Sequence, residues 1–185
     1  MKIMVTGNMG YIGPVLMSAL KEKGYDVIGY DSGYFADNLL EEINEDYLQI
    51  TKDIRDITKK DLAGIDTIIH LAGLSNDPLG EFSPKLTEDI NYIGTMQLAE
   101  MAKDVGVSRF VYASSQSMYG VSDTSSELDE DNSEKNPVTA YAIAKWNAEQ
   151  QLHSMITDDF VVTSLRPSTV FGASPRLRCD IVFNN

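Results

Sequence analysis

The feature that most constrains this chain is a glycine-rich turn near its start, TGNMGYIG at residues Thr6–Gly13. A short β-branched run, Lys2–Thr6, leads into the turn, and apolar residues at helical spacing follow it. Gly7 allows a sharp turn off a strand, Gly10 lets the backbone approach a pyrophosphate, and Gly13 lets the next helix pack tightly on a sheet. Because the amides of a first helical turn attract anions, the strand, turn and helix together predict a dinucleotide site.

An acidic residue at the expected distance supports the same prediction. Asp31 ends a second β-branched run, Asp26–Asp31, and lies 18 residues after Gly13. A carboxylate at that place accepts hydrogen bonds from the hydroxyls of an adenosine ribose, and it repels the 2′-phosphate of NADP. Since residues 32–35 hold no lysine or arginine that could neutralise such a phosphate, the sequence favours NAD as the cofactor.

Strand-like runs alternate with helical segments along the whole chain. Further strands are expected at residues 47–50, 67–72, 109–114 and 160–165, and helices at 11–23, 84–105 and 137–156. Such alternation is typical of right-handed βαβ units, so we predict an α/β fold: a Rossmann-type doubly wound parallel sheet with helices on both faces. The 185 residues, 43% of them apolar, suffice for one core, and the polar, acidic segment 120–136 is expected to form a long surface loop.

Charge and cysteine content exclude several classes of protein. The formal net charge is −13, with six acids and no base in residues 122–134, which disfavours nucleic acid or an acidic membrane face as a partner. The single cysteine, Cys179, cannot form an internal disulfide, and no apolar run has the length of a membrane span or the character of a signal peptide. We therefore expect a cytoplasmic protein. Two histidines and one cysteine without ligand spacing predict no metal site.

A tyrosine and a lysine four positions apart form the candidate catalytic pair. Tyr141 and Lys145 fall on one face of the expected helix, which brings an ammonium near a phenol. A free tyrosine titrates near about 10, so its use as a base requires a lower pKa, which a nearby ammonium favours. The hydroxyls of Ser114–Ser117 follow an expected strand, at the edge where parallel sheets bind ligands. Because a tyrosine and a lysine at this spacing also occur by chance, the pair indicates catalysis only in combination with the glycine turn and the serine hydroxyls.

Taken together, these motifs resemble the extended short-chain dehydrogenase/reductases, and among them the NAD-dependent epimerase/dehydratase family that acts on nucleotide sugars. The resemblance covers nearly the whole chain as an ordered set of motifs. They are the Thr6–Gly13 turn, Asp31, Asp53 with Ile54, HLAG at His70–Gly73, NYIGT at Asn91–Thr95, Ser114 and Ser115 with Tyr119 and Gly120, Tyr141 with Lys145, and LRPSTVFG at Leu165–Gly172.

The resemblance implies a role for each of these positions. It makes Ser115, Tyr141 and Lys145 the catalytic set, with Tyr141 as acid/base and Lys145 binding the nicotinamide ribose while lowering the pKa of the tyrosine. The implied cofactor contacts are Gly7, Gly10, Tyr11, Ile12, Gly13, Asp31, Asp53, Ile54, Leu71, Ala72, Gly73, Asn91, Tyr141, Lys145, Pro167 and Val170. The candidate substrate contacts are Ser75, Ser115, Gln116, Ser117 and Arg176.

Departures from the family's subgroups narrow the chemistry. Its 4,6-dehydratases carry an aspartate and a glutamate directly after the catalytic hydroxyl residue, where this chain has Gln116 and Ser117. Neither can serve as a carboxylate acid or base, so we expect an NAD-dependent nucleotide-sugar epimerase that removes and returns a hydride at sugar C4. An NAD(H)-dependent reductase or dehydrogenase, or a dehydratase, is the alternative. A non-catalytic dinucleotide-binding module is less favoured, since such relatives usually lack the tyrosine.

Four single residues keep two interpretations each. His70 ends an apolar run and fits a buried core histidine better than a proton-transfer group. Asn91, in an apolar helix, needs a partner, which is either the backbone or an active-site water network. Ser75 fits a substrate contact or a plain turn, and Arg176 fits substrate phosphates or an ordinary surface position.

Domain organisation follows from the same motif map. Residues 1–172 are expected to form the NAD-binding Rossmann domain with its catalytic residues, and residues 173–185 the start of a substrate-binding region. The half-apolar ending CDIVFNN suggests a cut chain without its C-terminal substrate lobe, so we expect weak NAD binding and little turnover from these residues alone. The resemblance also implies a homodimer formed through two helices, within residues 84–105 and 137–156.

Overall fold

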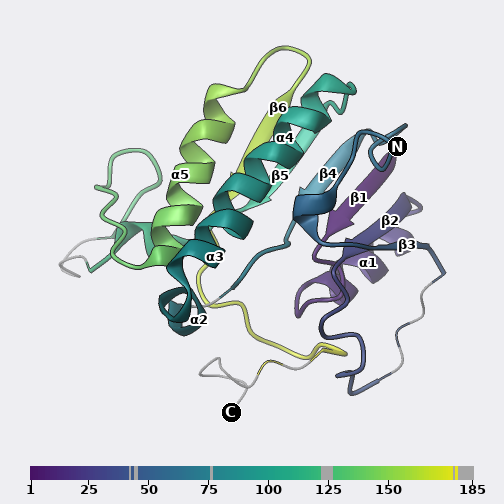
Figure 1. Ribbon diagram of the computed structural model, residues 1–185, viewed down its shortest axis with the longest axis horizontal. Coiled ribbons are helices and arrows are strands. Elements are labelled where there is room, and N and C mark those ends of the chain that lie inside the picture. Colours follow the sequence, from purple (N-terminus) through teal and green to yellow (C-terminus); the bar gives the residue numbers. More distant parts are fainter. Residues whose placement is uncertain (42, 44–45, 76, 122–126, 177, 179–185) are drawn as a thin grey trace.

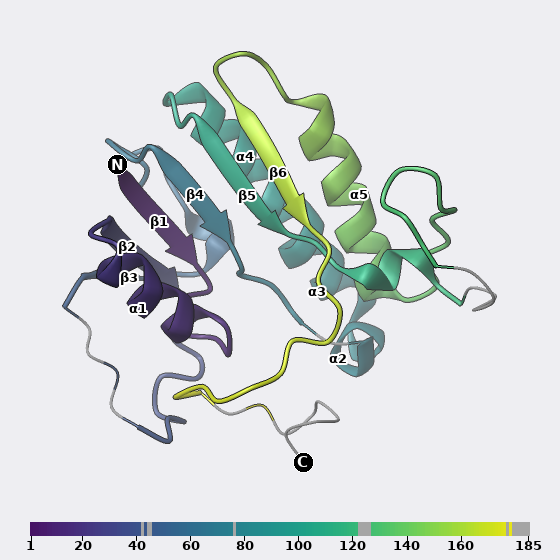
Figure 2. The ribbon, with the colours of Figure 1, turned by 180° about the vertical axis from the view of Figure 1, so that it is seen from behind.

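A six-stranded parallel sheet forms the centre of the protein. The computed structural model describes all residues except 42, 44–45, 76, 122–126, 177 and 179–185. The strands are β1 (Lys2–Thr6), β2 (Asp26–Asp31), β3 (Leu48–Thr51), β4 (Thr67–His70), β5 (Arg109–Ala113) and β6 (Val161–Leu165). Their order in the sheet is β3-β2-β1-β4-β5-β6, with every neighbouring pair parallel (Figures 1 and 2). The order reverses between β1 and β4, where doubly wound sheets bind their ligands.

Helices cover both faces of this sheet, which confirms the predicted Rossmann-type fold. The main ones are α1 (Gly13–Glu22), α4 (Thr95–Asp104) and α5 (Ala140–Ser154). Helices α4 and α5 lie side by side over β4, β5 and β6, and α1 lies on the opposite face, beside β1 and β2 (Figures 1 and 2). The described residues of segment 120–136 form no helix and no strand, as predicted.

The strands begin and end close to their predicted bounds, with one informative difference. β1 and β2 match, whereas the expected 67–72 strand ends at His70. The register explains this: Thr6 pairs with His70 as the last residue of β1, and the chain then turns away at Gly7. Residues Leu71–Gly73 therefore continue past the sheet, beside the glycine turn.

The expected helix at 84–105 is interrupted in the middle. It consists of α3 (Pro84–Glu88), a π-helical turn η2 (Asp89–Gly94) and α4, which starts at Thr95. Sequence patterning also missed the short helix α2 (Asp77–Phe82) and two 3₁₀ turns, η1 (Ile54–Asp56) and η3 (Gln116–Tyr119). These short elements lie at the carboxyl edge of the sheet or next to it, so their bends shape the candidate site.

Two apolar clusters hold the layers together. The larger lies between the sheet and α4 and α5, where Tyr30, Ile68 and Phe110 pack with helix residues such as Leu98 and Leu152. The smaller lies under α1 and consists of Ile3, Val5, Met17 and Val27 with their partly buried neighbours. Alternate residues of β1, β2 and β4 supply the two clusters, as the pleat of a sheet requires.

No helix within the described part of the chain has both the length and the apolar character needed to cross a membrane.

Candidate active site

The glycine turn has its shape because two of its glycines lie where a Cβ atom would overlap neighbouring backbone. Gly7 has a φ of 75°, and a Cβ there would lie 2.5 Å from the Ala72 nitrogen. At Gly13 a Cβ would overlap the Asn8 backbone, so the helix can approach the turn only without one. At Gly10, by contrast, a Cβ would meet only the Gly7 carbonyl oxygen, at 3.2 Å, so this position faces away from the protein. The turn therefore forms a cradle open at Gly10, which fits a pyrophosphate at the N-terminus of α1.

The Asp31 carboxylate is oriented by backbone amides. Its Oδ2 accepts a hydrogen bond from Met9 N at 3.1 Å and its Oδ1 from Gly33 N at 2.9 Å. Asp31 is half-buried at the end of β2, next to the glycine turn. The carboxylate thus lies where an adenosine ribose would continue from the cradle, and these residues fit the adenosine half of NAD.

Asp53 and Ile54 follow β3 and start the turn η1. The Asp53 carboxylate pairs with Arg55, 2.7 Å from its Nη2, and accepts from the Arg55 amide, which together hold the pKa of Asp53 below its usual value. The Ile54 side chain lies in the larger core cluster. A contact of Ile54 with adenine would therefore involve its backbone.

Leu71, Ala72 and Gly73 lie between the glycine turn and the candidate catalytic lysine. Leu71 N donates to Thr6 O at 2.9 Å, which keeps this segment beside the turn. A Cβ on Gly73 would lie 2.9 Å from Asn91 Oδ1 and 3.8 Å from Lys145 Nζ. The structure thus brings three groups of predicted site residues together along one edge of the sheet.

The Asn91 side chain bridges backbone groups, as one of its two interpretations expects. Its Oδ1 accepts from Leu74 N and its Nδ2 donates to Leu74 O, both at 2.8 Å. Asn91 lies in the π-helical turn η2, and its own carbonyl accepts from Thr95 Oγ1 at 2.9 Å. The widened turn therefore presents this amide to the segment after β4, and π-helical turns are frequent at functional sites.

The candidate catalytic pair lies on one face of α5, as its spacing predicts. The helix is capped by Thr139, whose Oγ1 accepts from Ala142 N at 3.1 Å. Lys145 is buried, its Nζ donates to Ala113 O at 2.8 Å, and it lies 6.0 Å from the ring centre of Tyr141 and 4.9 Å from that of Tyr112. Burial lowers the pKa of Lys145 to about 8. An ammonium held this close to a phenol favours its ionised form.

The hydroxyl residues after β5 form the turn η3. Ser115 is buried, its Oγ accepts from Ser117 N, and it lies 3.1 Å from Ser117 Oγ. Gln116 is exposed. Its backbone N donates to Pro167 O at 3.3 Å, which joins this turn to the segment after β6. Val170 and Ser75 are exposed, so the structure leaves both at the surface around the site.

His70 is a core histidine, as the sequence favoured. It is fully buried, with Thr6 Oγ1 2.6 Å from Nδ1 and Thr95 Oγ1 2.9 Å from Nε2. Because the Thr95 hydroxyl donates to Asn91 O, it accepts from Nε2, which assigns the proton of the neutral ring to Nε2. Burial, with a smaller contribution from the Lys145 charge, lowers the pKa of His70 to about 3. The ring is therefore neutral at physiological pH.

A buried ion pair on α5 was not predicted from the sequence. Glu149, which is buried, accepts from Arg166, with 2.5 Å between Oε1 and Nη2. The same guanidinium donates to the Tyr119 hydroxyl at 2.8 Å, so it joins α5 to the turn η3. Glu149 follows Lys145 by four positions, a spacing that places both on one face of α5. This spacing was the one sequence signal that Glu149 lies on the same helix face as Lys145.

Arg176 is not an ordinary surface arginine. It is 9% exposed, and its Nη1 donates to Phe35 O at 2.7 Å and to Asn38 O at 3.1 Å. Its guanidinium carbon lies 4.1 Å from the centre of the Phe35 ring. Residues 32–35, directly after Asp31, contain no lysine or arginine, but folding brings this distant cation into the same region.

The fold and this geometry define a class: a dinucleotide-binding Rossmann protein with a serine, tyrosine and lysine set at the carboxyl edge of its sheet. The model of the NAD-dependent epimerase/dehydratase family matches residues 3–182. The chain belongs to this family, whose cofactor is NAD. The glycine cradle and the oriented Asp31 carboxylate fit that cofactor.

Individual relatives agree with the family. The chain is 31% identical to a UDP-glucose 4-epimerase of Mycolicibacterium smegmatis, over 93% of this chain and 57% of that protein. It is 30% identical to a probable UDP-glucuronate 4-epimerase of Rhizobium meliloti, over 93% and 54%. The chain thus spans just over half the length of these curated relatives.

Solved structures show the same relationship. MoeE5 in complex with UDP-glucose and NAD superposes with a TM-score of 0.84 at 28% identity, covering 100% of this chain and 59% of that one. A UDP-glucuronic acid 4-epimerase from Bacillus cereus, solved with NAD, gives a TM-score of 0.82 at 28% identity, covering 100% and 61%.

Proposed function

We propose that this chain forms the cofactor-binding and catalytic part of an NAD-dependent nucleotide-sugar 4-epimerase, with Tyr141 as the acid/base. One observation carries the proposal: the buried Lys145 ammonium lies between Gly73, beside the cofactor cradle, and the ring of Tyr141. A cation at this junction can contact a nicotinamide ribose and favour a phenolate at the same time. Relatives that are named UDP-sugar 4-epimerases support the choice of reaction.

The chemistry divides between the cofactor and the chain. NAD, when bound, supplies a reversible acceptor for the hydride from sugar C4. Tyr141 then takes the proton of the C4 hydroxyl while the alcohol becomes a ketone, and it returns the proton when the hydride is delivered to the other face of the sugar. Lys145 stabilises the phenolate form of the tyrosine, and Ser115 holds the reacting oxygen by a hydrogen bond.

The residues beside Ser115 favour epimerisation over dehydration. A dehydratase needs further acid and base groups at C5 and C6, whereas epimerisation needs one proton-transfer group. Gln116 and Ser117, which occupy the relevant positions, carry no carboxylate, and Ser117 is hydrogen-bonded within the turn. The single tyrosine therefore matches the simpler cycle.

The test measures what the complete protein does to nucleotide sugars. Incubated with NAD and either UDP-glucose or UDP-glucuronic acid, it is expected to invert C4, seen by NMR, without net NADH. Tyr141→Phe should lower the rate by about 100-fold or more, since general acid–base catalysis contributes on that scale. Stoichiometric NADH would instead indicate a dehydrogenase. Absence of both C4 inversion and NADH formation would contradict the proposal.

We also propose that the protein is a cytoplasmic homodimer that pairs through the outer faces of α3, η2 and α5. Leu86, Ile93 and Ile143 expose between 37% and 43% of their surface on these elements. Apolar side chains gathered on neighbouring helices are typical of an interface. Light scattering of the purified protein measures its mass directly.

A further inference from the structure

The segment after β6 returns across the sheet to the adenosine end of the candidate site. It runs from β6 along the carboxyl edge and ends beside the loop that follows β2 (Figures 1 and 2). We call residues Gly172–Arg176 the clasp. Its contacts are with two segments that lie more than 130 positions away in the chain, the glycine turn and the loop after Asp31.

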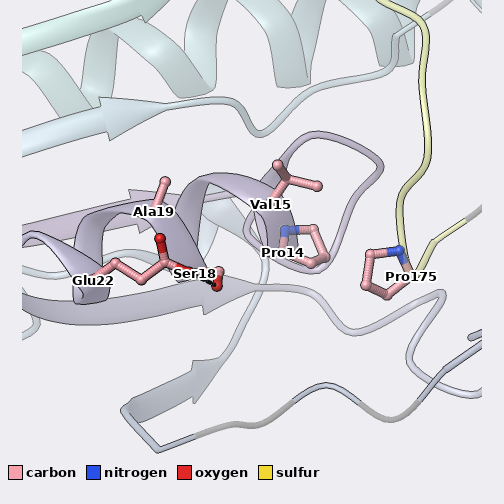
Figure 3. Close-up of a pocket in the computed structure, with 6 residues that line it drawn as sticks. All are labelled: Pro14, Val15, Ser18, Ala19, Glu22 and Pro175. Carbon is pink, nitrogen blue, oxygen red and sulfur yellow. Dashed lines mark hydrogen bonds between the residues drawn. The ribbon is translucent and has the colours of Figure 1, made fainter.

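The first end of the clasp is bound to the glycine turn through Tyr11. The Tyr11 hydroxyl donates to Gly172 O at 2.6 Å, and Ser174 Oγ donates to Tyr11 O at 2.7 Å. Pro175 then lies beside Pro14 and Val15 at the start of α1, where these residues line one end of a hollow of about 360 Å³ (Figure 3). The clasp is therefore fastened directly next to the phosphate cradle.

The second end is bound to the loop after Asp31. Leu40 N donates to Pro175 O at 2.8 Å, and the Arg176 guanidinium donates to two carbonyls of the loop while covering the Phe35 ring. One short segment thus links the cradle for the pyrophosphate with the loop after Asp31, whose carboxylate is the candidate contact of the adenosine ribose.

The charge of Arg176 connects the clasp with an anionic ligand. Among the described residues, the Arg176 guanidinium donates to carbonyl oxygens and lies over an aromatic ring, and these partners are all neutral. A buried cation is costly unless an anion compensates it. Among the described residues, Asp31 is an anion whose charge acts on Arg176, and the resemblance assigns Asp31 to the cofactor ribose. A bound dinucleotide would bring a diphosphate to the same region.

We propose that the clasp retains NAD, with Arg176 as its main positioning residue. By fixing the glycine turn to the loop after Asp31, it holds the two parts that grip the adenosine diphosphate at their bound spacing. This inference rests on the proposed function, in which one NAD molecule must stay in place to return the hydride that it received.

The experiment measures how fast NAD leaves the protein. The complete protein is loaded with NAD, and dissociation is followed by displacement with excess NADH, whose fluorescence changes on binding. Arg176→Ala should release NAD about tenfold faster, because a charged hydrogen-bonding group is lost. Arg109→Ala is the matched control, since Arg109 is exposed at the start of β5, the opposite edge of the sheet, and should leave the rate unchanged.

A second variant keeps the test decisive if Arg176→Ala does not fold. Tyr11→Phe removes only the hydroxyl that donates to Gly172, so it loosens the other end of the clasp with the ring retained. It should also accelerate NAD release. Equal rates for the wild type, the folded clasp variants and Arg109→Ala would overturn the clasp alone. Failure of the wild-type protein to bind NAD would contradict the proposed function as well.

Discussion

The two halves of the sheet build their parts of the site by different means. In the half formed by β1, β2 and β3, the site consists mainly of backbone, shaped by glycines whose missing Cβ atoms would overlap neighbouring chain. In the half formed by β4, β5 and β6, the candidate site consists of side chains such as Tyr141 and the buried Lys145, and two further buried ionisable residues, His70 and Glu149, support it. Substitutions in the first half are therefore limited by the space around the backbone, and substitutions in the second half by the pairing of buried charges.

The difference predicts which changes each half tolerates. A cradle for a pyrophosphate needs close approach of backbone amides, so a side chain added at Gly7 or Gly13, where it would overlap backbone, should disturb the cradle together with the local fold. A buried charge instead depends on its partners, because removal of one partner leaves the other desolvated and unpaired. The following variants separate the two effects, beginning with the largest.

The strongest test of the first half is Gly7→Ala compared with Gly64→Ala. Both glycines have a φ of 75°, but a Cβ at Gly64 would meet nothing within 4 Å, while one at Gly7 would overlap backbone of Leu71 and Ala72. We expect Gly64→Ala to cost about 1 kcal/mol, from its left-handed backbone alone. Gly7→Ala should cost more than about 4 kcal/mol. Urea unfolding measures both, and equal losses would show that close approach is unimportant.

The second half is tested by Arg166→Met. This change leaves the Glu149 carboxylate buried without its cation, so we expect a loss of about 3–5 kcal/mol in the free energy of unfolding. Adding Glu149→Leu should recover most of that loss. The control, Lys59→Met, breaks the exposed pair with Asp104 and should cost less than about 1 kcal/mol. If Arg166→Met costs no more than this control, the buried pair does not support α5.

The smallest expected effect is the acid sensitivity conferred by His70. Its pKa is about 3 in the folded protein against an ordinary value of 6.5. Above pH 6.5 the ring is neutral in both states, but as the pH falls below 6.5 the unfolded chain binds a proton first. Stability therefore decreases from pH 6.5 towards pH 3, by about 2 kcal/mol at pH 5.

The variant His70→Asn should flatten this decrease, measured by urea unfolding between pH 7 and pH 5. His153→Asn is its control, because His153 is exposed near the end of α5. The same decrease in all three proteins would assign the acid sensitivity to other groups.

The parts of the candidate site that could be predicted from the sequence are those that depend on residues close together in the chain. The glycine turn, the Asp31 position and the spacing of Tyr141 and Lys145 each depend on neighbours within about one helix or one strand. The strands β1 and β2 match for the same reason, since their β-branched runs are bounded by the turn and by Asp31.

Other features could not be predicted because their partners are far apart in the chain. The π-helical turn at Asn91 serves a hydrogen bond to Leu74, which no helical pattern records. Arg166 meets both Glu149 and Tyr119 only after β5, β6 and α5 have assembled. Patterns that depend on i and i+4 positions carry no information on such contacts.

The sequence alone determined the order of strands and helices along the chain, the glycine turn and the residue types of the candidate catalytic set, because periodicity, backbone freedom and short spacings are local properties. Only the tertiary structure decided that Lys145 is buried with a lowered pKa, that His70 is neutral, and that Arg176 lies beside the adenosine end. Desolvation and the pairing of charges depend on everything that packs around a group, so folding had to supply them.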